Sequence, residues 1–463
     1  MKQPIFIDNE KAQIIHKATI EVLEKTGIQL DNKQAENILL ENGAKKDKDG
    51  RILIPGSLVE SALAKSLSSF TLYDRNGNES LIVEEGRTYF GPGSDALYQR
   101  DLISGEIRES CLEDITNNVK VADALEFDFI MSMALPRHIP EKKLYPAVFA
   151  EVVKNTHRPI VFTAINIRDV RHIHKIAQIA QGEKEIFKPF MIAYVEPISP
   201  LRLDNENVEN LIYCADNDIP FLFAAGANCG TGSPITPEGG IVQGGAESLA
   251  GFVIAILRNP SAKFIYGANV SSSDMRSGFV CYGASEWSRT VAMTADMGTF
   301  YNLPSWGAAG CTDALEIDAQ AAWEAYRGIM MALLSESTFL HDMGYMSFGE
   351  LYDLRFLVLV AEMLREAKHM LKPIDISRDS LAIDTIDEVA RSASLYLAHP
   401  HTKKYFRKSL WLSKLINRNR IGQEHTDIKI KLEEKAKDIL ANHKPDMLDD
   451  KKRIEIEEYL ESI

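Results

Sequence analysis

Eight short apolar runs, each followed by a loop and then by a segment with helical spacing, constrain the fold of this chain more than any other feature. They cover residues 88–90, 127–135, 159–165, 189–195, 220–225, 263–270, 303–309 and 338–343. Continuous apolar strands that alternate with helices are typical of a parallel sheet covered on both faces. Eight such repeats predict an α/β fold with a closed (β/α)₈ TIM barrel, whose last helix covers residues 350–370.

The segments on either side of these repeats have a different character. Helical spacing is found over residues 10–25 and 34–42, and a third helix is expected to open at residues 55–57. Strands 70–74 and 79–83, joined by a turn that contains Asn76-Gly77, predict a β-hairpin. We therefore expect an N-terminal helical segment with a hairpin (residues 1–87), the barrel (88–372) and a C-terminal helical extension (373–463).

The C-terminal extension is charged and carries a basic patch. Its members are Lys403, Lys404, Arg407, Lys408, Lys414, Arg418 and Arg420. A solvated helix face and a docking surface both explain such a patch.

Charge and cysteine content limit the class of protein. The net charge of −14 argues against nucleic acid and against anionic membranes as main partners. The N-terminus lacks the pattern of a signal peptide, and no run approaches the roughly 18 apolar residues of a membrane span. The five cysteines include no CxxC pair and are expected to be reduced thiols. We predict a soluble cytoplasmic protein, and homo-oligomer formation stays open.

In a (β/α)₈ barrel the chemistry belongs at the carboxyl ends of the strands. The polar and aromatic residues expected there are Asp95, Tyr98, Glu196, Asn228, Asn269, Trp306, Asp313, His341, Asp342, Tyr345 and Phe348. Lys263 is the single lysine between residues 189 and 367, and it begins its strand, which argues against Schiff-base chemistry. The loops after the last two strands lack basic residues, which argues against phosphorylated substrates.

Acids and aromatic rings without fixed cations suit a positively charged, weakly hydrated ligand such as a quaternary ammonium group. Trp306 and Tyr98 follow the seventh and first strands. Taking these strands as neighbours in the closed barrel, we expect the two rings to flank one ammonium group.

Residues 226–251 contain eight glycines, an unusual density for a segment that follows a strand. Bare backbone allows a close approach by a ligand or by a neighbouring strand. The glycines do not fit a dinucleotide fingerprint, since Ile235 stands at the third position. We assign ligand approach to the loop 226–240, and close helix packing explains Gly244, Gly245 and Gly251 equally well.

A set of motifs in this order resembles the trimethylamine methyltransferase family, in its branch that lacks pyrrolysine. The motifs cover residues 196–201, 214–220, 226–251, 312–313, 318–320 and 344–349. The resemblance implies a (β/α)₈ enzyme that moves a methyl group from a quaternary amine to the Co(I) corrinoid of a separate partner protein, with no tightly bound cofactor. It suggests glycine betaine, proline betaine, carnitine or γ-butyrobetaine as the amine.

Within this interpretation each candidate residue has an expected role. We expect His341, Glu196 and Asp313 to serve catalysis, and Tyr98, Asp95, Asn228, Trp306, Tyr345, Phe348 and Arg276 to bind substrate. Gly226, Gly230 and Gly232 are expected to face the corrinoid. A substrate carboxylate would be met by Arg276, Arg289, His341 or backbone N–H groups of the glycine loop.

Two other functions fit the same residues. A zinc-dependent methanol or thiol methyltransferase would use Glu196, Cys229 and Cys311 as metal ligands. A protein that binds a betaine without turning it over would keep the aromatic cage and lack catalysis. The quaternary amine hypothesis needs no bound metal, because the leaving amine is neutral and no nucleophile has to be deprotonated.

Overall fold

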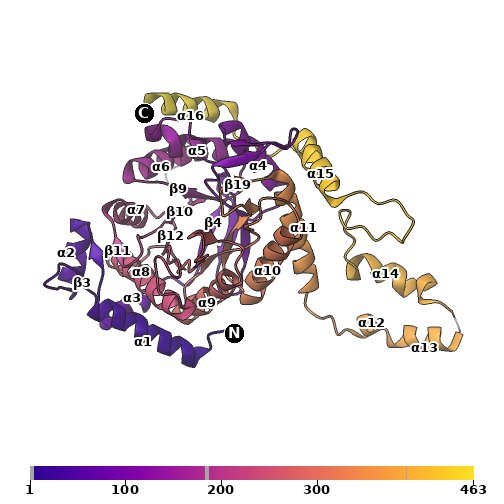
Figure 1. Cartoon of the computed structure of the whole chain (residues 1–463), viewed down its shortest axis with the longest axis horizontal. Coiled ribbons are helices and arrows are strands. Elements are labelled where there is room, and N and C mark those ends of the chain that lie inside the picture. The colour runs from indigo at the N-terminus through magenta and orange to yellow at the C-terminus, as the bar shows by residue number, and fades with distance from the viewer. Residues whose placement is uncertain (1–4, 183–186, 393) are drawn as a thin grey trace.

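The N-terminal segment forms the expected helices and hairpin. The computed structural model describes residues 5–182, 187–392 and 394–463 (Figure 1). The helices are α1 (Asn9–Lys25), α2 (Lys33–Glu41) and α3 (Gly56–Leu63), and short strands β1 (Gln29–Leu30), β2 (Lys45–Lys46) and β3 (Ile52–Leu53) lie between them. Asp8 caps α1 by accepting the Lys11 N–H at 3.0 Å. The hairpin consists of β4 (Phe70–Tyr73) and β5 (Glu79–Val83), as the Asn-Gly turn predicts.

Seven of the eight apolar runs form parallel strands. They are β6 (Tyr89–Pro92), β9 (Ile160–Thr163), β10 (Met191–Val195), β12 (Phe221–Ala224), β13 (Phe264–Gly267), β16 (Trp306–Ala308) and β17 (Phe339–Met343). One parallel sheet has the order β13-β12-β10-β9 and another the order β16-β17-β6. An isolated parallel bridge between Tyr266 and Ser305 links the two sheets. The strands therefore follow one another in space in the order of the chain.

The run 127–135 is the exception, and its prediction as a full strand was wrong. It contributes one parallel bridge, from Ile130 to Ile160. The Asp128 N–H donates to the Phe90 carbonyl at 2.8 Å, and its carboxylate accepts the Phe90 N–H at 2.9 Å. This side chain replaces a ladder hydrogen bond, and Met133 at φ +60° then turns the chain out of the extended conformation.

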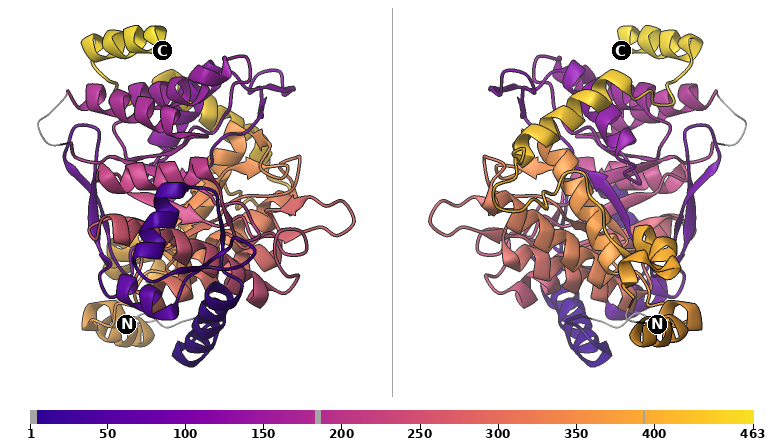
Figure 2. Two further views of the ribbon diagram at one scale, coloured as in Figure 1. Left: turned by 90° about the vertical axis from the view of Figure 1, so that its left-hand side faces the viewer. Right: turned by 90° about the vertical axis from the view of Figure 1, so that its right-hand side faces the viewer.

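Helices follow the strands as predicted. They are α4 (Leu112–Ala124), α5 (Glu141–Asn155), α6 (Ile167–Gln181), α7 (Asn205–Asp216), α8 (Pro237–Arg258), α9 (Ser285–Tyr301), α10 (Ala319–Ser335) and α11 (Leu354–Met370). They surround the strands in Figures 1 and 2. By length and composition α8 could cross a membrane, contrary to our expectation that no run comes close, but 83% of its apolar window is buried in the protein. It is a core helix in this fold.

The glycines of α8 are explained by close packing. A Cβ atom on Gly251 would lie 2.4 Å from the Phe223 ring, and one on Gly244 would lie 2.8 Å from the Ala268 carbonyl oxygen. Real Cβ atoms do not approach this closely, so a side chain at either position would push the helix off the strands. The packing interpretation is confirmed for these two positions.

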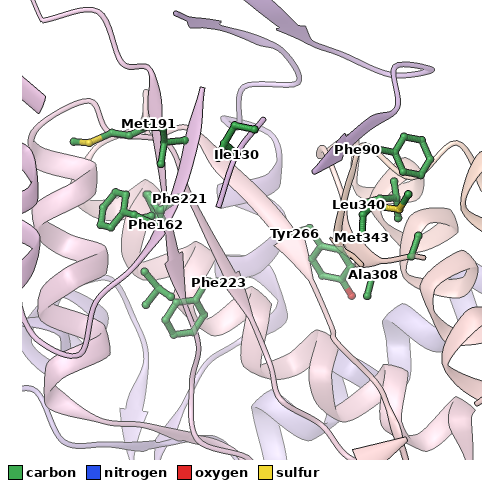
Figure 3. Close-up of a cluster of buried hydrophobic side chains, with 14 of the residues drawn as sticks. Phe90, Ile130, Phe162, Met191, Phe221, Phe223, Tyr266, Ala308, Leu340 and Met343 are labelled. Carbon is green, nitrogen blue, oxygen red and sulfur yellow. The ribbon is translucent and has the colours of Figure 1, made fainter. Parts of the chain in front are cut away.

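Alternate residues of the strands enter two separate hydrophobic clusters. The larger cluster fills the space between strands and helices, and Figure 3 shows members such as Phe162, Phe221 and Leu340. The smaller cluster lies on the other face and contains Phe129, Val161, Ile192, Leu222, Ile265, Trp306 and Phe339. The two-residue period of strands explains the alternation. Phe70, Leu72, Leu81 and Val83 of the hairpin join the smaller cluster, so β4 and β5 cover one end of it.

Further short strands decorate the carboxyl side of the main strands. One sheet of four consists of β7 (Tyr98–Arg100), β8 (Ile107–Glu109), β18 (Tyr345–Met346) and β19 (Leu351–Tyr352). Two further pairs are β14 (Ser272–Ser273) with β15 (Val280–Cys281), and β11 (Arg202–Leu203) with β1. These strands arise from the loops that follow the main strands. They thicken the side on which the sequence predicts chemistry.

The C-terminal extension is helical, as predicted. It comprises α12 (Arg378–Leu381), α13 (Ile383–Ser392), the 3-10 helix η1 (Tyr396–Ala398), α14 (Pro400–Ser409), α15 (Ile428–Asn442) and α16 (Asp450–Ser462). α15 packs on α4 and α11, and α16 packs on α5 and α6. In contrast, α12, α13 and α14 project away from the rest of the protein (Figure 1).

Candidate active site

A cavity of about 870 Å³ opens at the carboxyl ends of the main strands. Its lining includes Asp95, Thr163, Tyr145, Tyr194, Glu196, Gly226, Asn228, Asn269, Tyr282, Trp287, His341, Asp342 and Tyr345. Thr163, Tyr194 and His341 each lie two residues beyond a member of the smaller hydrophobic cluster. Because side chains two residues apart on a strand share a face, that cluster forms the floor of the cavity.

The lining is rich in carboxylates. Asp95, Glu196, Asp204, Glu206 and Asp342 contribute to it, and no lysine or arginine does among the residues that the structure describes. Burial raises the pKa of Asp95 to about 6, although hydrogen bonds from Thr163, Ser132 and Ser94 oppose this. Burial also raises the pKa of Glu196 to about 7, against the charge of His341. The Glu196 side chain is exposed to the solvent of this open cavity, whereas Asp95 is half-buried.

His341 and Asp342 form a buried pair with unused hydrogen-bonding capacity. His341 Nδ1 lies 2.7 Å from Asp342 Oδ1. His341 Nε2 and Asp342 Oδ2 are both buried, and neither has a hydrogen-bond partner among the described residues. An orphaned buried polar atom costs stability unless a ligand or water meets it. The pair therefore presents one nitrogen and one oxygen for a bound molecule.

A tyrosine positions Glu196 from the side. Asn269 donates its side-chain N–H to the Tyr194 hydroxyl at 2.8 Å, and that hydroxyl donates to Glu196 Oε1 at 3.5 Å. Asn269, Asp95 and Asp342 all have positive φ, at 37°, 61° and 69°. Such backbone conformations are disfavoured for residues other than glycine and gather at functional sites.

Aromatic rings form the remaining walls. Tyr145, Tyr194, Tyr282, Trp287 and Tyr345 line the cavity. Tyr282 stacks on Trp287 with ring centroids 4.6 Å apart and meets Tyr345 edge to face at 6.0 Å. Ring faces and carboxylates together attract a cation that cannot donate a hydrogen bond.

The structure brings together six of the predicted site residues. His341, Glu196, Asp95, Asn228, Tyr345 and Gly226 all line the cavity. Gly226 faces Glu196: a Cβ on this glycine would lie 3.5 Å from Glu196 Oε1. Asn228 is fixed by the Ser271 hydroxyl, which donates to its side-chain oxygen.

The predicted Trp306 and Tyr98 cage is not formed. Strand β17 separates β16 from β6, so the two strands are not neighbours as we had expected. Trp306 is fully buried and lies beneath His341, on which it stacks at 4.8 Å with an interplanar angle of 26°. Tyr98 lies on β7 and pairs with Leu351 and Glu109 in another sheet. Neither ring lines the cavity.

Three other candidates also lie outside the cavity lining. Arg276 is 92% exposed and pairs with Asp274, because its loop extends into solvent. Phe348 packs against Phe279 at 5.3 Å. Asp313 accepts the Tyr282 N–H at 2.8 Å, so it braces the cavity wall without reaching the interior, and burial raises its pKa to about 6.

The remaining loop and metal candidates are also separated from the cavity. Gly230, at φ +90°, approaches Met275, and Gly232 packs near Ser199. Arg289 pairs with Glu238 at 2.7 Å. Within the described ranges, no group of three or more histidine, cysteine, aspartate or glutamate residues is placed to hold a metal ion, so Glu196, Cys229 and Cys311 do not converge.

Several lining residues escaped the sequence analysis. Tyr282 and Trp287 come from the long loop after β13 and from the start of α9, where no strand end marks them. Thr163 and Tyr194 lie within predicted strands, and their period-two spacing from Val161 and Ile192 could have identified them.

Comparisons with known proteins identify the family of this chain. The family described as trimethylamine methyltransferase (MTTB) matches residues 3–462. A glycine betaine methyltransferase of Desulfitobacterium hafniense (strain Y51) is 26% identical over 451 residues, which are 96% of this chain and 94% of the relative. Trimethylamine methyltransferase MttB of Desulfitobacterium hafniense (strain DSM 10664 / DCB-2) is 28% identical, covering 96% and 90%.

A solved structure resembles the fold. The crystal structure of the Methanosarcina barkeri monomethylamine methyltransferase (MtmB) matches with a TM-score of 0.51 at 15% identity, over 94% of this chain and 88% of that one. The family match spans nearly the whole chain and confirms the interpretation of the sequence motifs. The chain belongs to the trimethylamine methyltransferase (MTTB) family and is a methyltransferase.

Proposed function

We propose that this enzyme transfers a methyl group from a quaternary amine to the Co(I) centre of a corrinoid carried by a separate protein. The observation that carries the proposal is the cavity, which combines carboxylates and aromatic rings with no lysine or arginine among its described lining residues. Relatives named for glycine betaine and for trimethylamine support an amine substrate.

Glu196 and Asp95 are the groups best suited to attract the ammonium ion. Both line the cavity, so a bound cation would stabilise their ionised forms and lower their raised pKa values. Tyr194, Tyr282 and Tyr345 offer ring faces, each worth roughly 0.5–2 kcal/mol to a cation. These walls also exclude water from the methyl group.

The chemistry asks for alignment more than for proton transfer. The methyl carbon–nitrogen bond breaks, its electron pair stays on nitrogen, and a neutral tertiary amine leaves. The corrinoid is a co-substrate that supplies a strong nucleophile with the electron pair for the new bond. The protein's part is to hold the amine with one methyl group facing the opening and to keep solvent away.

His341 is the candidate for a substrate carboxylate. Its buried Nε2 has no hydrogen-bond partner among the described residues, while Arg276 and Arg289 are paired elsewhere. The choice among glycine betaine, proline betaine, carnitine and γ-butyrobetaine depends on how far this nitrogen lies from the ammonium position. We assign the approach of the corrinoid to the loop that holds Gly226, Gly230 and Gly232.

The proposal also includes the fold of the enzyme. The parallel strands follow one another in chain order, and the bridge from Tyr266 to Ser305 connects their sheets on one side. On the other side the segment 127–135 connects them, through the bridge from Ile130 to Ile160 and the hydrogen bond from Asp128 to Phe90. We infer one (β/α)₈ barrel over residues 88–372, with residues 1–87 and 373–463 as its extensions. Five free thiols suit a reducing compartment, so we place the enzyme in the cytoplasm.

A substrate panel tests the function. The purified enzyme is mixed with Co(I) cobalamin and each of the four quaternary amines, with trimethylamine and with an uncharged tert-butyl analogue, and methylation is followed by the loss of Co(I) absorbance. We expect turnover with at least one quaternary amine, unchanged by a chelator, and none with the tert-butyl compound. Binding without methylation would support a non-catalytic protein, and chelator-sensitive turnover of methanol or a thiol would support the zinc enzyme. Either result would overturn the proposal.

A further inference from the structure

Residues 373–392 and 394–414, here called the arm, are folded but leave most of their apolar side chains in solvent. α12, η1 and α14 contain no buried residue, and in α13 Val389 alone is buried. The exposed apolar residues include Ile374 (89%), Ile376 (76%), Ile383 (52%), Ile386 (51%), Leu395 (72%) and Leu397 (85%). An exposed apolar surface of this extent marks a protein interaction site.

The arm is not a loose tail, because its own side chains hold it together. Asp379 accepts hydrogen bonds from Lys404 and Tyr405, and His399 lies 3.4 Å from Glu388. Its return end is fixed to α11, where His369 Nε2 lies 3.3 Å from the Ser409 carbonyl oxygen. The helices of the arm are thus held out beside the rest of the protein (Figures 1 and 2).

Isolated helices of ten residues are marginal in water, so α13 needs a surface to cover it. Ile383 and Ile386 lie three residues apart on one side of this helix, and Asp384 and Glu388 lie on the other. This amphipathic pattern is typical of a helix that packs on protein.

A groove between α10 and α11, here called the α10–α11 groove, offers a matching surface. It has a volume of about 820 Å³ and is lined by Trp323, Tyr326, Leu359, Met363, Glu362 and Glu366, with Leu415, Ile416 and Ile428 at its end. Trp323 is 73% exposed, which is unusual for an indole ring. The groove is therefore apolar with an acidic rim.

Charge identifies the occupant as this chain itself. The arm carries seven lysine or arginine residues and five aspartate or glutamate residues, and its basic residues gather around α14, since residues 399–414 hold five of them and no acid. The groove carries Glu362 and Glu366 against one arginine, Arg327. A basic, apolar segment fits an acidic, apolar surface, and a second copy provides both. In a two-fold dimer the same pair of surfaces would meet twice.

We propose that the arm packs on the α10–α11 groove of a second copy of this chain, so that two copies cover each other's apolar surfaces. The chain then exists as a homodimer or as a higher even assembly built from such pairs. This proposal is independent of the reaction, because the arm contributes nothing to the lining of the active-site cavity.

The mass of the full chain in solution tests the proposal. Sedimentation velocity is run from 0.1 to 50 μM on the wild type and on Ile383→Ser/Ile386→Ser. The control, Asp384→Ser/Glu388→Ser, also introduces two serines, but on the opposite side of α13. We expect twice the 51.8 kDa chain mass, or an even multiple, for wild type and control, and at least a tenfold weaker dimer for the isoleucine variant. A monomeric wild type, or an isoleucine variant as tight as the control, would overturn the proposal.

A second pair of variants tests the groove. Trp323→Ser should weaken the dimer at least tenfold, whereas Ile103→Ser, which removes another highly exposed apolar side chain, should leave it unchanged. Circular dichroism checks that both variants are folded. An unchanged dimer in Trp323→Ser would mean that the arms pack on each other or elsewhere, which would overturn the assignment to the α10–α11 groove.

Discussion

The active-site cavity and the arm depart in opposite ways from the rule that proteins bury apolar groups and expose polar ones. The cavity contains buried polar atoms, such as His341 Nε2 and Asp342 Oδ2, that have no hydrogen-bond partner in the part of the chain that the structure describes. The arm exposes apolar side chains without a cover, such as Ile376 and Leu397. One region gathers carboxylates in a cavity without lysine or arginine among its described lining residues, and the other holds basic and apolar groups in bulk water.

Buried polar atoms without hydrogen bonds and apolar side chains in solvent therefore indicate two different kinds of partner. A buried polar atom needs a small ligand that can enter the cavity, and the acids of the lining select a cation. An exposed apolar helix needs a large dry surface, which a protein supplies. Each of the following predictions tests the cavity, the arm or both.

The largest effect is expected at the floor of the cavity, where Trp306 belongs to ordinary core packing. Trp306→Leu leaves a void beside Phe129 and Phe339, and we expect it to destabilise the protein by about 3 kcal/mol. Urea unfolding measures this loss. The control Phe279→Leu replaces a ring that is 58% exposed and should cost less than about 0.5 kcal/mol. Equal stability of the two variants would mean that the floor is not part of the core.

A smaller effect is expected at the wall, where Glu196 supplies charge. Glu196→Gln keeps the shape of the side chain and removes its charge, so affinity for a quaternary amine substrate should fall by roughly 10- to 30-fold, or about 1.4–2 kcal/mol. Affinity for the uncharged tert-butyl analogue should not change. Calorimetry with both ligands makes the measurement, and equal losses for both would show that Glu196 acts through shape.

The pH dependence of wild-type binding tests independently whether Glu196 acts through its charge. The pKa of Glu196 is raised to about 7 and that of Asp95 to about 6, and a cation prefers their ionised forms. Affinity should therefore rise as the pH increases from about 5.5 to 8, and Glu196→Gln should lose the part of this rise near pH 7. The stability of the ligand-free protein has the opposite pH dependence. Because folding raises the pKa of Glu196, the protein loses stability as the pH rises from the ordinary pKa of a glutamate toward about 7.

The sequence predicted which residues end the strands but not how deep each one lies. Glu196 directly follows an apolar run, Asp95 comes shortly after one and His341 lies inside the last run, and all three line the cavity. Trp306 is also a strand residue, yet it lies at the first position of β16 and so falls one layer lower, in the floor. Periodicity gives the face of a residue, whereas its height depends on the register between strands, which pairing alone determines.

Loops and surfaces were harder to predict. Tyr98 was expected at a strand end, but its loop forms β7 and carries the ring into a separate sheet. Tyr282 enters the cavity from a long loop whose conformation no local pattern fixes. The basic patch of the arm was visible in the sequence. The exposure of Ile383 and Ile386 was not, because an amphipathic helix gives the same pattern whether or not its own chain covers it.

The smallest effect expected is that of salt, and it should separate the two regions in one experiment. Raising the ionic strength from 0.05 to 0.5 M shortens the Debye length from about 14 Å to about 4 Å. The lysines and arginines of the arm are exposed, so their attraction to an acidic partner is screened, and the dimer should weaken by about three- to tenfold, or less than about 1.4 kcal/mol. Glu196 and Asp95 line the cavity and act on a bound cation at distances shorter than the Debye length, so affinity for a quaternary amine should change less than about twofold. Sedimentation and calorimetry on the same samples give both values. If the dimer affinity does not depend on salt, the apolar contacts of Ile383 and Ile386 act without help from charge. If the affinity for the quaternary amine falls strongly with salt, ions in the cavity screen Glu196 and Asp95.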